Sequence, residues 1–379
     1  MRIGIVVGEK SGDFLGASLM RELTSINPKI TFEGILGPEM IEVGGDKWAS
    51  SQELSVMGII EPLKVLPRLL LLRRRIFKRW QENPPDIFIG IDAPEFNLTL
   101  ESKLRKEGII TVHYVSPSIW AWRKNRIRKI INCVDKILCI LPFEPNLYKK
   151  YNFPAVFVGH PLADNLPYHL NKDEIRRNFN INSGILIAIL PGSRMSEVKR
   201  LGSYFAKAAK LLLKNYVNIS FIAPMASKDI YKQFDVYLEQ ENIRKSFILV
   251  EGNSHECMIA SDLVLAASGT AVLESSLLNR PTVAVYKVSL SSYIFLKTMI
   301  RIKHFTLPNI LLKKEVVPEL IQNDLSAESL SKVASNLLED RNAREIMKSE
   351  FKTLRKKLSV NKDRIAAKEI LKLHKEDKQ

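Results

Sequence analysis

A strand-to-helix turn in the second half of the chain carries the residue types that hold a phosphate group. The apolar run 262–266 is followed by Ser268, Gly269 and Thr270, and then by a predicted helix with Glu274 in its first turn. Glycine lets the backbone approach an anion closely, the two hydroxyls supply donors, and the free amides of the new helix point toward negative charge. The segment therefore predicts a phosphate-binding turn.

The carboxylate of Glu274 is not explained by the start of this helix alone. A capping box places Glu three residues after its Ser or Thr cap, and neither Ser268 nor Thr270 has that spacing to Glu274. An acceptor beside a phosphate site suits the diol of a ribose, as in dinucleotide-binding folds. The alternative is a first-turn Glu stabilised by the helix dipole.

A second loop of this kind follows the first strand of the same half of the chain. The apolar run that ends at Leu190 leads to Gly192, Ser193 and Arg194, with Glu197 three residues later. Arg194 supplies a planar cation that matches phosphate oxygens, although an ordinary turn with a solvated Arg is the alternative. Two anion-binding loops on strands that can be neighbours favour a pyrophosphate.

The first predicted strand also ends in a polar loop, made of Gly8, Glu9, Ser11, Gly12 and Asp13. Its spacing is neither that of a dinucleotide-binding turn nor that of a Walker loop. It has more polar groups than a turn needs, which favours substrate binding, with Asp13 as a candidate catalytic carboxylate. A tight turn with Asp13 near a helix start is the alternative.

Asp92 ends an otherwise apolar strand and is our candidate for a general base. In parallel sheets, ligands sit at the carboxyl ends of the strands, where such a carboxylate can take a proton from a substrate hydroxyl. Glu95 and Asn97 are potential polar partners. The alternative is that Asp92 caps the helix predicted from Pro94.

The next strand ends in a segment that combines aromatic and hydroxyl side chains. Ser116, Ser118, Trp120 and Trp122 could form flat apolar walls with donors, which suits a sugar ring or an acyl chain. A well-filled edge of the core is the alternative.

No metal ion or other cofactor is required by the sequence. Asp-x-Asp does not occur in the chain, and the six histidines are too scattered for a metal-binding motif. Charge on a leaving pyrophosphate would then fall to Arg194, to helix amides and to Asn309.

The composition points to a globular protein with an anionic partner. The chain has 379 residues and a formal net charge of +16, which suits nucleic acid, an acidic lipid surface or a phosphorylated substrate. Three cysteines without paired spacing predict neither a disulfide framework nor a zinc site, and the N-terminus does not resemble an export signal. The most apolar window, 54–72, contains charges and prolines that a membrane-spanning helix would not carry.

Apolar β-branched runs alternate with amphipathic stretches along the chain, which predicts two Rossmann-like parallel-sheet α/β domains that face a cleft. We expect an N-terminal domain over residues 1–165, a nucleotide-binding domain over 166–340, and helices over 341–379 that pack back on the N-terminal domain or on a partner subunit. The linker is expected within 161–182. The predicted strands are 3–7, 31–36, 86–91, 109–115, 136–141, 155–158, 185–190, 219–223, 247–250, 263–266 and 282–286.

The stretch from Leu63 to Trp80 contains seven basic residues and no acidic ones, interleaved with apolar residues. A basic amphipathic helix is typical of a segment that lies on an anionic membrane surface. A helix that covers the core with a solvated basic face is the alternative.

Taken together, these motifs resemble the lipid-A-disaccharide synthase family. The segments that carry the resemblance follow in order from the first strand to Glu319: 8–13, 90–94, 114–123, 190–194, 267–271 and 307–309. The departures from the family's pattern are Lys10, in the first loop, and Val272.

The resemblance implies a GT-B fold, an inverting transfer without a metal, and a site on the cytoplasmic face of the inner membrane. The donor would be UDP-2,3-diacylglucosamine and the acceptor 2,3-diacylglucosamine 1-phosphate, giving a β-1,6-linked tetraacyl disaccharide 1-phosphate and UDP. By resemblance, Asp92 would deprotonate the 6-hydroxyl of the acceptor. The residues implied to hold the pyrophosphate are Arg194, Ser268, Gly269, Thr270 and Asn309, with Glu274 on the ribose.

Two other functions remain open at this stage. One is a UDP-sugar enzyme of the same fold, either a glycosyltransferase with a soluble acceptor or an epimerase. The other is a non-catalytic basic protein that binds nucleotides or RNA, but Asp92 and Glu274 would repel phosphate unless a sugar lay between, so no nucleic-acid partner is expected. A homodimer is compatible with the sequence.

Overall fold

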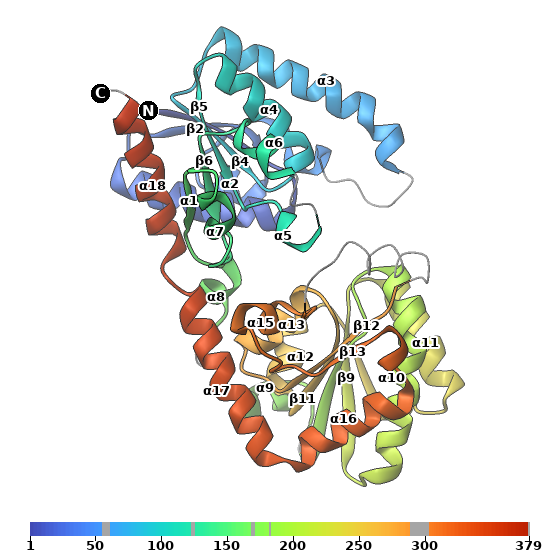
Figure 1. The fold of residues 1–379 in the computed structure, drawn as a ribbon. Helices are drawn as coiled ribbons and strands as arrows, with labels where there is room; N and C mark the ends of the chain where they lie inside the picture. Colours follow the sequence, from blue (N-terminus) through green and yellow to red (C-terminus); the bar gives the residue numbers. More distant parts are fainter. Residues whose placement is uncertain (55–60, 123–125, 168–170, 182, 289–302, 378–379) are drawn as a thin grey trace. The chain divides into compact units, whose positions relative to one another are not determined.

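The computed structural model describes residues 1–54, 61–122, 126–167, 171–181, 183–288 and 303–377. The chain forms two compact units (Figure 1), one of Met1–Asp164 with Leu358–Gln379 and the other of Asn165–Lys357. The chain passes from the first unit to the second between residues 164 and 165, one residue from the predicted boundary at 165/166. It returns to the first unit between residues 357 and 358, whereas the predicted boundary was at 340/341.

The N-terminal unit is built on a seven-stranded sheet of order β3-β2-β1-β4-β5-β6-β7, in which every pair is parallel. Its strands are β1 (Arg2–Val7), β2 (Thr31–Leu36), β3 (Asp46–Ser50), β4 (Ile87–Ile91), β5 (Ile110–Tyr114), β6 (Lys136–Cys139) and β7 (Ala155–Phe157). Six of these strands were predicted, and the polar edge strand β3 was not.

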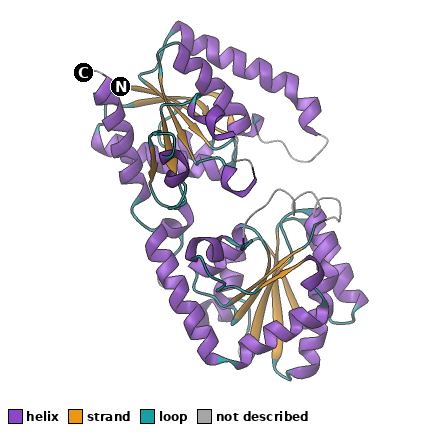
Figure 2. Ribbon diagram, viewed as in Figure 1, coloured by secondary structure: helices purple, strands orange, loops and turns teal. Residues whose placement is uncertain are grey.

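Both faces of this sheet are buried, because successive side chains of its central strands enter two different cores. Ile3 and Ile5 of β1 pack with Leu15 and Leu19, whereas Val6 packs with Trp80. Figure 2 shows helices on both faces of the sheet. The helices are α1 (Lys10–Ile26), α2 (Pro38–Glu42), α3 (Glu61–Glu82), α4 (Pro94–Lys106), α5 (Ile119–Trp122), α6 (Ile127–Ile131), α7 (Pro145–Lys149), α8 (Pro161–Asn165) and α18 (Lys362–Asp377).

The second unit contains a six-stranded parallel sheet of order β10-β9-β8-β11-β12-β13. Its strands are β8 (Ile185–Leu190), β9 (Ile219–Met225), β10 (Phe247–Glu251), β11 (Leu263–Ala267), β12 (Thr282–Tyr286) and β13 (Glu319–Ile321). Its helices are α9 (Lys172–Asn178), α10 (Met195–Asn215), α11 (Lys228–Gln240), α12 (Ser254–Ala260), α13 (Thr270–Leu277), α15 (Leu307–Leu312), α16 (Ala327–Glu339) and α17 (Arg341–Leu358). The predicted pair of parallel-sheet α/β domains with a helical tail is confirmed.

The C-terminal helix α18 is part of the N-terminal unit of its own chain. Ala366, Ala367 and Ile370 are completely buried in the core beside α1 and β1. Lys136 Nζ lies 2.6 Å from Glu369 Oε2, so an ion pair joins β6 to the same helix. In the part of the chain that the structure describes, no helix is long and apolar enough to span a membrane.

Candidate functional site

The carboxyl ends of four strands of the second sheet surround a cavity of about 600 Å³. Strands β8 and β11 are neighbours, with Leu190 opposite Ala266, so the two predicted anion-binding loops lie side by side. The cavity is lined by eight predicted residues, namely Gly192, Ser193, Arg194, Glu197, Ser268, Gly269, Thr270 and Glu274. Their convergence gives the second unit one candidate binding pocket.

The loop after β8 is held by Glu197. Its Oε2 accepts hydrogen bonds from the amides of Ser193 at 3.0 Å and Arg194 at 3.3 Å, which caps the start of α10. Gly192 has φ +127°, and a Cβ there would lie 2.5 Å from Cβ of Glu197, so only glycine fits this turn. The Arg194 side chain also pairs with Glu197, with Nη1 3.7 Å from Oε1, but it is 80% exposed and therefore accessible to a ligand.

The loop after β11 leaves its donors accessible. Gly269 is the N-cap of α13 and makes no side-chain cap bond, and Gly269 and Thr270 are exposed. The first amides of a helix have no partner within it and carry partial positive charge, so this helix start can bind an anion.

Glu274 is not in the first turn of α13, which begins at Thr270, so that prediction is wrong. The helix dipole therefore does not explain this carboxylate, because the dipole effect is confined to the first and last turns of a helix. Glu274 Oε2 instead lies 3.4 Å from Nε2 of His255, at the start of α12. The hydrogen bond with Glu274 raises the pKa of His255.

Asn309 was predicted to face the pyrophosphate, but its described contacts are those of a structural residue. It is completely buried in α15. Its Nδ2 donates to Val317 O and Glu319 Oε1, each at 2.8 Å. Its Oδ1 accepts from the amides of Val316 and Val317. Both donors and both acceptor positions are occupied, so the geometry shows no free group for a phosphate.

Two further segments of this pocket were missed from the sequence. The residues concerned are Pro224, Met225, Ala226, Gly252 and Ser254. They follow or end β9 and β10, so the rule that ligands bind at the carboxyl ends of parallel strands could have found them.

In the N-terminal unit, Asp92 lies in a strained turn at the end of β4. Asp92 has φ +52° and Ala93 has φ +43°, and both conformations are uncommon for residues other than glycine. Ala93, not Asp92, is the N-cap of α4, so the capping alternative is not supported. No hydrogen bond or ion pair engages the Asp92 carboxylate within the described residues.

The loop after β1 lies beside this turn. A Cβ on Gly8 would be 2.7 Å from Cβ of Ala93, so the close approach of the two loops requires glycine. Helix α1 begins at Lys10, and Glu9 and Ser11 are exposed around its start. Gly12, in contrast, is buried.

Asp13 points away from any open surface. Its side chain is buried, and its two oxygens accept hydrogen bonds from the amides of Glu39 and Met40, each at 3.1 Å. These contacts connect α1 to the first turn of α2. The predicted catalytic role of Asp13 has no geometric support here, because both oxygens hold backbone groups.

A buried polar cluster that the sequence did not reveal lies beneath Asp92. Asn97 Nδ2 donates to the carbonyl oxygen of Asp92 at 2.8 Å and fixes the turn. Glu101, one helical turn later, pairs with His113 of β5. Val115, which follows β5, has φ +78°, a strained value for a β-branched residue, so a second neighbouring strand also ends in strain.

The aromatic segment after β5 is divided between core and surface. Ser116 is buried and its Oγ lies 2.8 Å from the hydroxyl of Tyr148, as expected for the core alternative. Trp120 packs edge-on against Phe143. Ser118 is exposed and remains accessible. The side chain of Trp122 and residue 123 lie outside the described residues.

Within the described ranges there is no group of three or more His, Cys, Asp or Glu side chains that could hold a metal ion. Among the described residues that line the pocket of the second unit, Arg194 supplies the positive charge.

Two parallel-sheet α/β units, with a phosphate-type pocket in the second, define a protein of the GT-B class. The fold is similar to that of UDP-GlcNAc 2-epimerase from Neisseria meningitidis bound to UDP-GlcNAc, with a TM-score of 0.67, 14% identity, and coverage of 98% of this chain and 100% of that one. It is also similar to an Anabaena protein in complex with UDP and glucose, with a TM-score of 0.58, 12% identity, and coverage of 98% and 99%. At these identities, the likeness shows the fold alone.

The family follows from the sequence comparisons. A model of the lipid-A-disaccharide synthetase family matches residues 3–370. The lipid-A-disaccharide synthases of Hahella chejuensis and Wigglesworthia glossinidia brevipalpis are each 43% identical, over 98% and 96% of this chain and 94% and 95% of their own lengths. The chain therefore belongs to the lipid-A-disaccharide synthase family, which consists of glycosyltransferases of lipid A biosynthesis.

Proposed function

We propose that this enzyme transfers a diacylglucosamine unit from UDP-2,3-diacylglucosamine to the 6-hydroxyl of 2,3-diacylglucosamine 1-phosphate, with inversion at the anomeric carbon. The products are a β-1,6-linked tetraacyl disaccharide 1-phosphate and UDP. The observation that carries this proposal is the Asp92 carboxylate, which forms no hydrogen bond or ion pair within the described residues and lies in a left-handed turn at the carboxyl end of β4.

In this proposal, Asp92 is the general base. It takes the proton of the 6-hydroxyl as that oxygen attacks the anomeric carbon of the donor, and the bond from that carbon to the pyrophosphate oxygen breaks. Asn97 is a positioning residue, because its Nδ2 holds the carbonyl oxygen of Asp92. A positioned base of this kind contributes about 10² to 10⁴-fold to the rate.

The pocket of the second unit would bind the UDP portion of the donor. The amides at the start of α13, with Ser268 and Thr270, would face the pyrophosphate, and Arg194 would neutralise charge on the departing UDP. Glu274 would accept hydrogen bonds from the ribose hydroxyls. The segments at the ends of β9 and β10 would supply the wall beside the uracil ring.

The experiment that tests the reaction measures UDP release from UDP-2,3-diacylglucosamine with and without the monosaccharide lipid acceptor. Acceptor-dependent release together with a disaccharide product is expected. Release without acceptor, or epimerisation of the donor sugar, would contradict the proposal and favour another enzyme of the same fold class.

We also propose that the enzyme attaches to the cytoplasmic face of the inner membrane through α3. The helix has two parts. Leu72, Ile76 and Trp80 are buried in the core, whereas Leu66, Leu70 and Leu71 are exposed large apolar residues. Arg74, Arg75 and Lys78 are exposed on the same helix. An exposed apolar strip beside cations is the pattern of an interfacial helix. The side chains of residues 61–65 lie outside the described part.

Vesicle binding tests this attachment. A Leu71→Asp variant should lose binding to vesicles that contain phosphatidylglycerol, and Val236→Asp, at an exposed apolar position on α11, is the matched control. Equal binding by the two variants would exclude α3 as the attachment surface.

A further inference from the structure

A second cavity in the C-terminal unit lies at the amino ends of the strands of the same sheet. It has a volume of about 400 Å³ and is lined by Gly184 and Ile185 at the start of β8, Asp262 before β11, Pro281 before β12, and the first turns of α17. In parallel α/β sheets, substrates bind at the carboxyl ends of the strands, so this cavity at the amino ends is separate from the candidate donor pocket.

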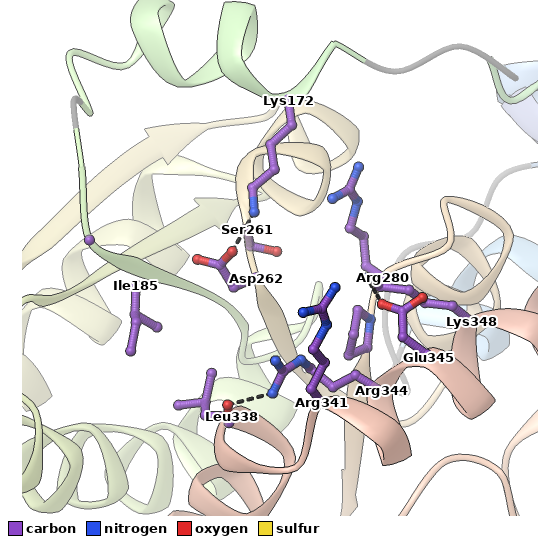
Figure 3. A pocket seen from close by; sticks show the side chains of 12 residues that line it. Lys172, Ile185, Ser261, Asp262, Arg280, Leu338, Arg341, Arg344, Glu345 and Lys348 are labelled. Atoms are coloured by element: carbon purple, nitrogen blue, oxygen red, sulfur yellow. Dashed lines mark hydrogen bonds and ion pairs between the residues drawn. The ribbon is translucent and has the colours of Figure 1, made fainter.

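The lining of this cavity is strongly basic. Five basic side chains line it, namely Lys172, Arg280, Arg341, Arg344 and Lys348, together with only two carboxylates, those of Asp262 and Glu345. Figure 3 shows Lys172 of α9, Arg280 before β12, and Arg341 and Arg344 of α17 around this cavity.

Both carboxylates of the lining form ion pairs with lysine or arginine side chains. Asp262 forms ion pairs with Lys172 and Arg176, and its Oδ2 also accepts the amide of Leu186 at 2.8 Å. Glu345 pairs with Lys348 at 2.8 Å. Asp340, next to α17, accepts the amide of Ala343 as the cap of that helix. Arg344 donates to the carbonyl oxygens of Leu337 and Leu338, so its main contacts are with the backbone.

Two guanidinium groups of the lining, those of Arg280 and Arg341, do not take part in these pairs. Within the described residues, the side chains of Arg280 and Arg341 form no hydrogen bond or ion pair, and Nε of Arg280 is buried without a partner. Burial lowers the pKa of Arg280, and the charge of Asp262 offsets this only in part. A buried donor without a partner destabilises the protein, and a bound anion would supply that partner.

We propose that this cavity is a second anion site, in which Arg280 and Arg341 bind the phosphate group of a phosphorylated ligand. Guanidinium groups present paired donors that match phosphate oxygens, and the excess of cations suits a doubly charged group. The volume exceeds that of one phosphate, and Ile185, Pro281 and Leu338 supply apolar walls for the rest of a ligand. A soluble phosphate ester and a phospholipid headgroup share this chemistry.

The test is a titration of the full-length enzyme with inorganic phosphate, with and without saturating UDP, which occupies the proposed donor pocket. Calorimetry and the shift of the melting temperature report binding. Arg341→Gln should weaken phosphate binding about tenfold or more, the typical effect of losing one charge-assisted contact. Lys356→Gln, at an exposed lysine of the same helix, removes the same charge away from the cavity and should have no effect.

Arg280→Gln provides a second variant, and Arg341→Lys tests whether charge alone is sufficient. Melting temperatures without phosphate identify any variant that fails to fold, and Arg341 is exposed at the helix start, where a substitution is tolerated. Wild-type enzyme that does not bind phosphate in either condition, or equal affinities for Arg341→Gln and Lys356→Gln, would overturn the proposal.

Vesicles identify the source of the phosphate. Binding to phosphatidylglycerol vesicles that depends on Arg341 and is displaced by inorganic phosphate supports a lipid headgroup as the ligand. Arg341-dependent phosphate binding with unchanged vesicle binding supports a soluble phosphate ester. The proposal does not depend on the proposed function, because the comparison of Arg341→Gln with Lys356→Gln holds even if the donor pocket does not bind UDP.

Discussion

Nδ1 of His113 lies 2.8 Å from Oε1 of Glu101, and both side chains are completely buried. Burial raises the pKa of Glu101, while the charge of His113 and its hydrogen bond oppose that rise. The pair joins α4 to β5, one helical turn beyond the Asn97 side chain that fixes the Asp92 turn. The conformation of the candidate base therefore depends on a polar cluster in the core.

Gly90 is expected to be essential for this cluster. A Cβ at position 90 would lie 2.1 Å from Oε1 of Glu101, so Gly90→Ala must displace the carboxylate or the helix. We expect a loss of about 1–3 kcal/mol in the free energy of unfolding, as for other overpacked cores, together with lower turnover. Urea denaturation measures the first effect. In the double variant with Glu101→Ala, the two losses should be less than additive, and full additivity would show that the clash is not the cause.

Asp92→Asn is expected to reduce turnover by about 10² to 10⁴-fold, because the amide cannot accept the proton of the acceptor hydroxyl. UDP binding should be unchanged, since the pocket proposed for UDP is built from residues of the second unit. Steady-state kinetics and calorimetry measure the two quantities. Turnover within a few fold of the wild type would exclude Asp92 as the base.

The regular parts of the fold could be predicted because strands buried on both faces read as apolar runs. Strand β2 was predicted at its observed bounds, whereas the edge strands β3 and β13 were missed. Strand β3 contains Asp46 and Lys47, and β13 has only three residues, so neither gives a continuous apolar signal.

The candidate site was predictable where local sequence determines geometry. The loops after β8 and β11 converge as expected, because neighbouring parallel strands end at the same edge. The environment of Asn309 was not predictable, because its partners at 316–319 are set by the tertiary course of that loop. Left-handed residues such as Val115 also carry no local signal, since surrounding contacts impose the strain.

The pair formed by His255 and Glu274 should make UDP binding depend on pH. The hydrogen bond with Glu274 raises the pKa of His255, so protonated His255 holds the carboxylate more strongly as pH falls through the neutral range. Ribose hydroxyls must compete for the same oxygens, so the affinity for UDP should decrease from pH 8 to pH 6, roughly over the range in which histidine titrates. Calorimetry at several pH values measures it, and His255→Gln should flatten the dependence. An unchanged slope in that variant would assign the pH effect to the ligand.

Glu197 should support both the stability of α10 and the binding loop. Glu197→Ala removes the acceptor for the amides of Ser193 and Arg194, and loss of such a cap costs about 1 kcal/mol. Weaker UDP binding is also expected, because the loop that presents Arg194 loses its support. Glu197→Gln retains one carbonyl acceptor and should keep most of both properties. If the two variants behaved alike, the charge of Glu197 and not its capping geometry would be responsible.

Glu144 should make the stability of the N-terminal unit decrease with rising pH. Its carboxyl group is buried before α7, and burial raises its pKa from 4.5 to about 8, despite the hydrogen bond from the amide of Leu141. The folded state therefore holds a proton that the unfolded state releases between pH 4.5 and about 8. The contribution of this group to stability is full below pH 4.5 and is lost as pH rises through about 8. Glu144→Gln keeps the shape and an acceptor but does not titrate, so the free energy of unfolding of the wild type should fall relative to this variant between pH 5 and pH 8.5, about the range set by the two pKa values. Urea denaturation at each pH gives the difference, and parallel curves for the two proteins would show that Glu144 remains charged in the folded state.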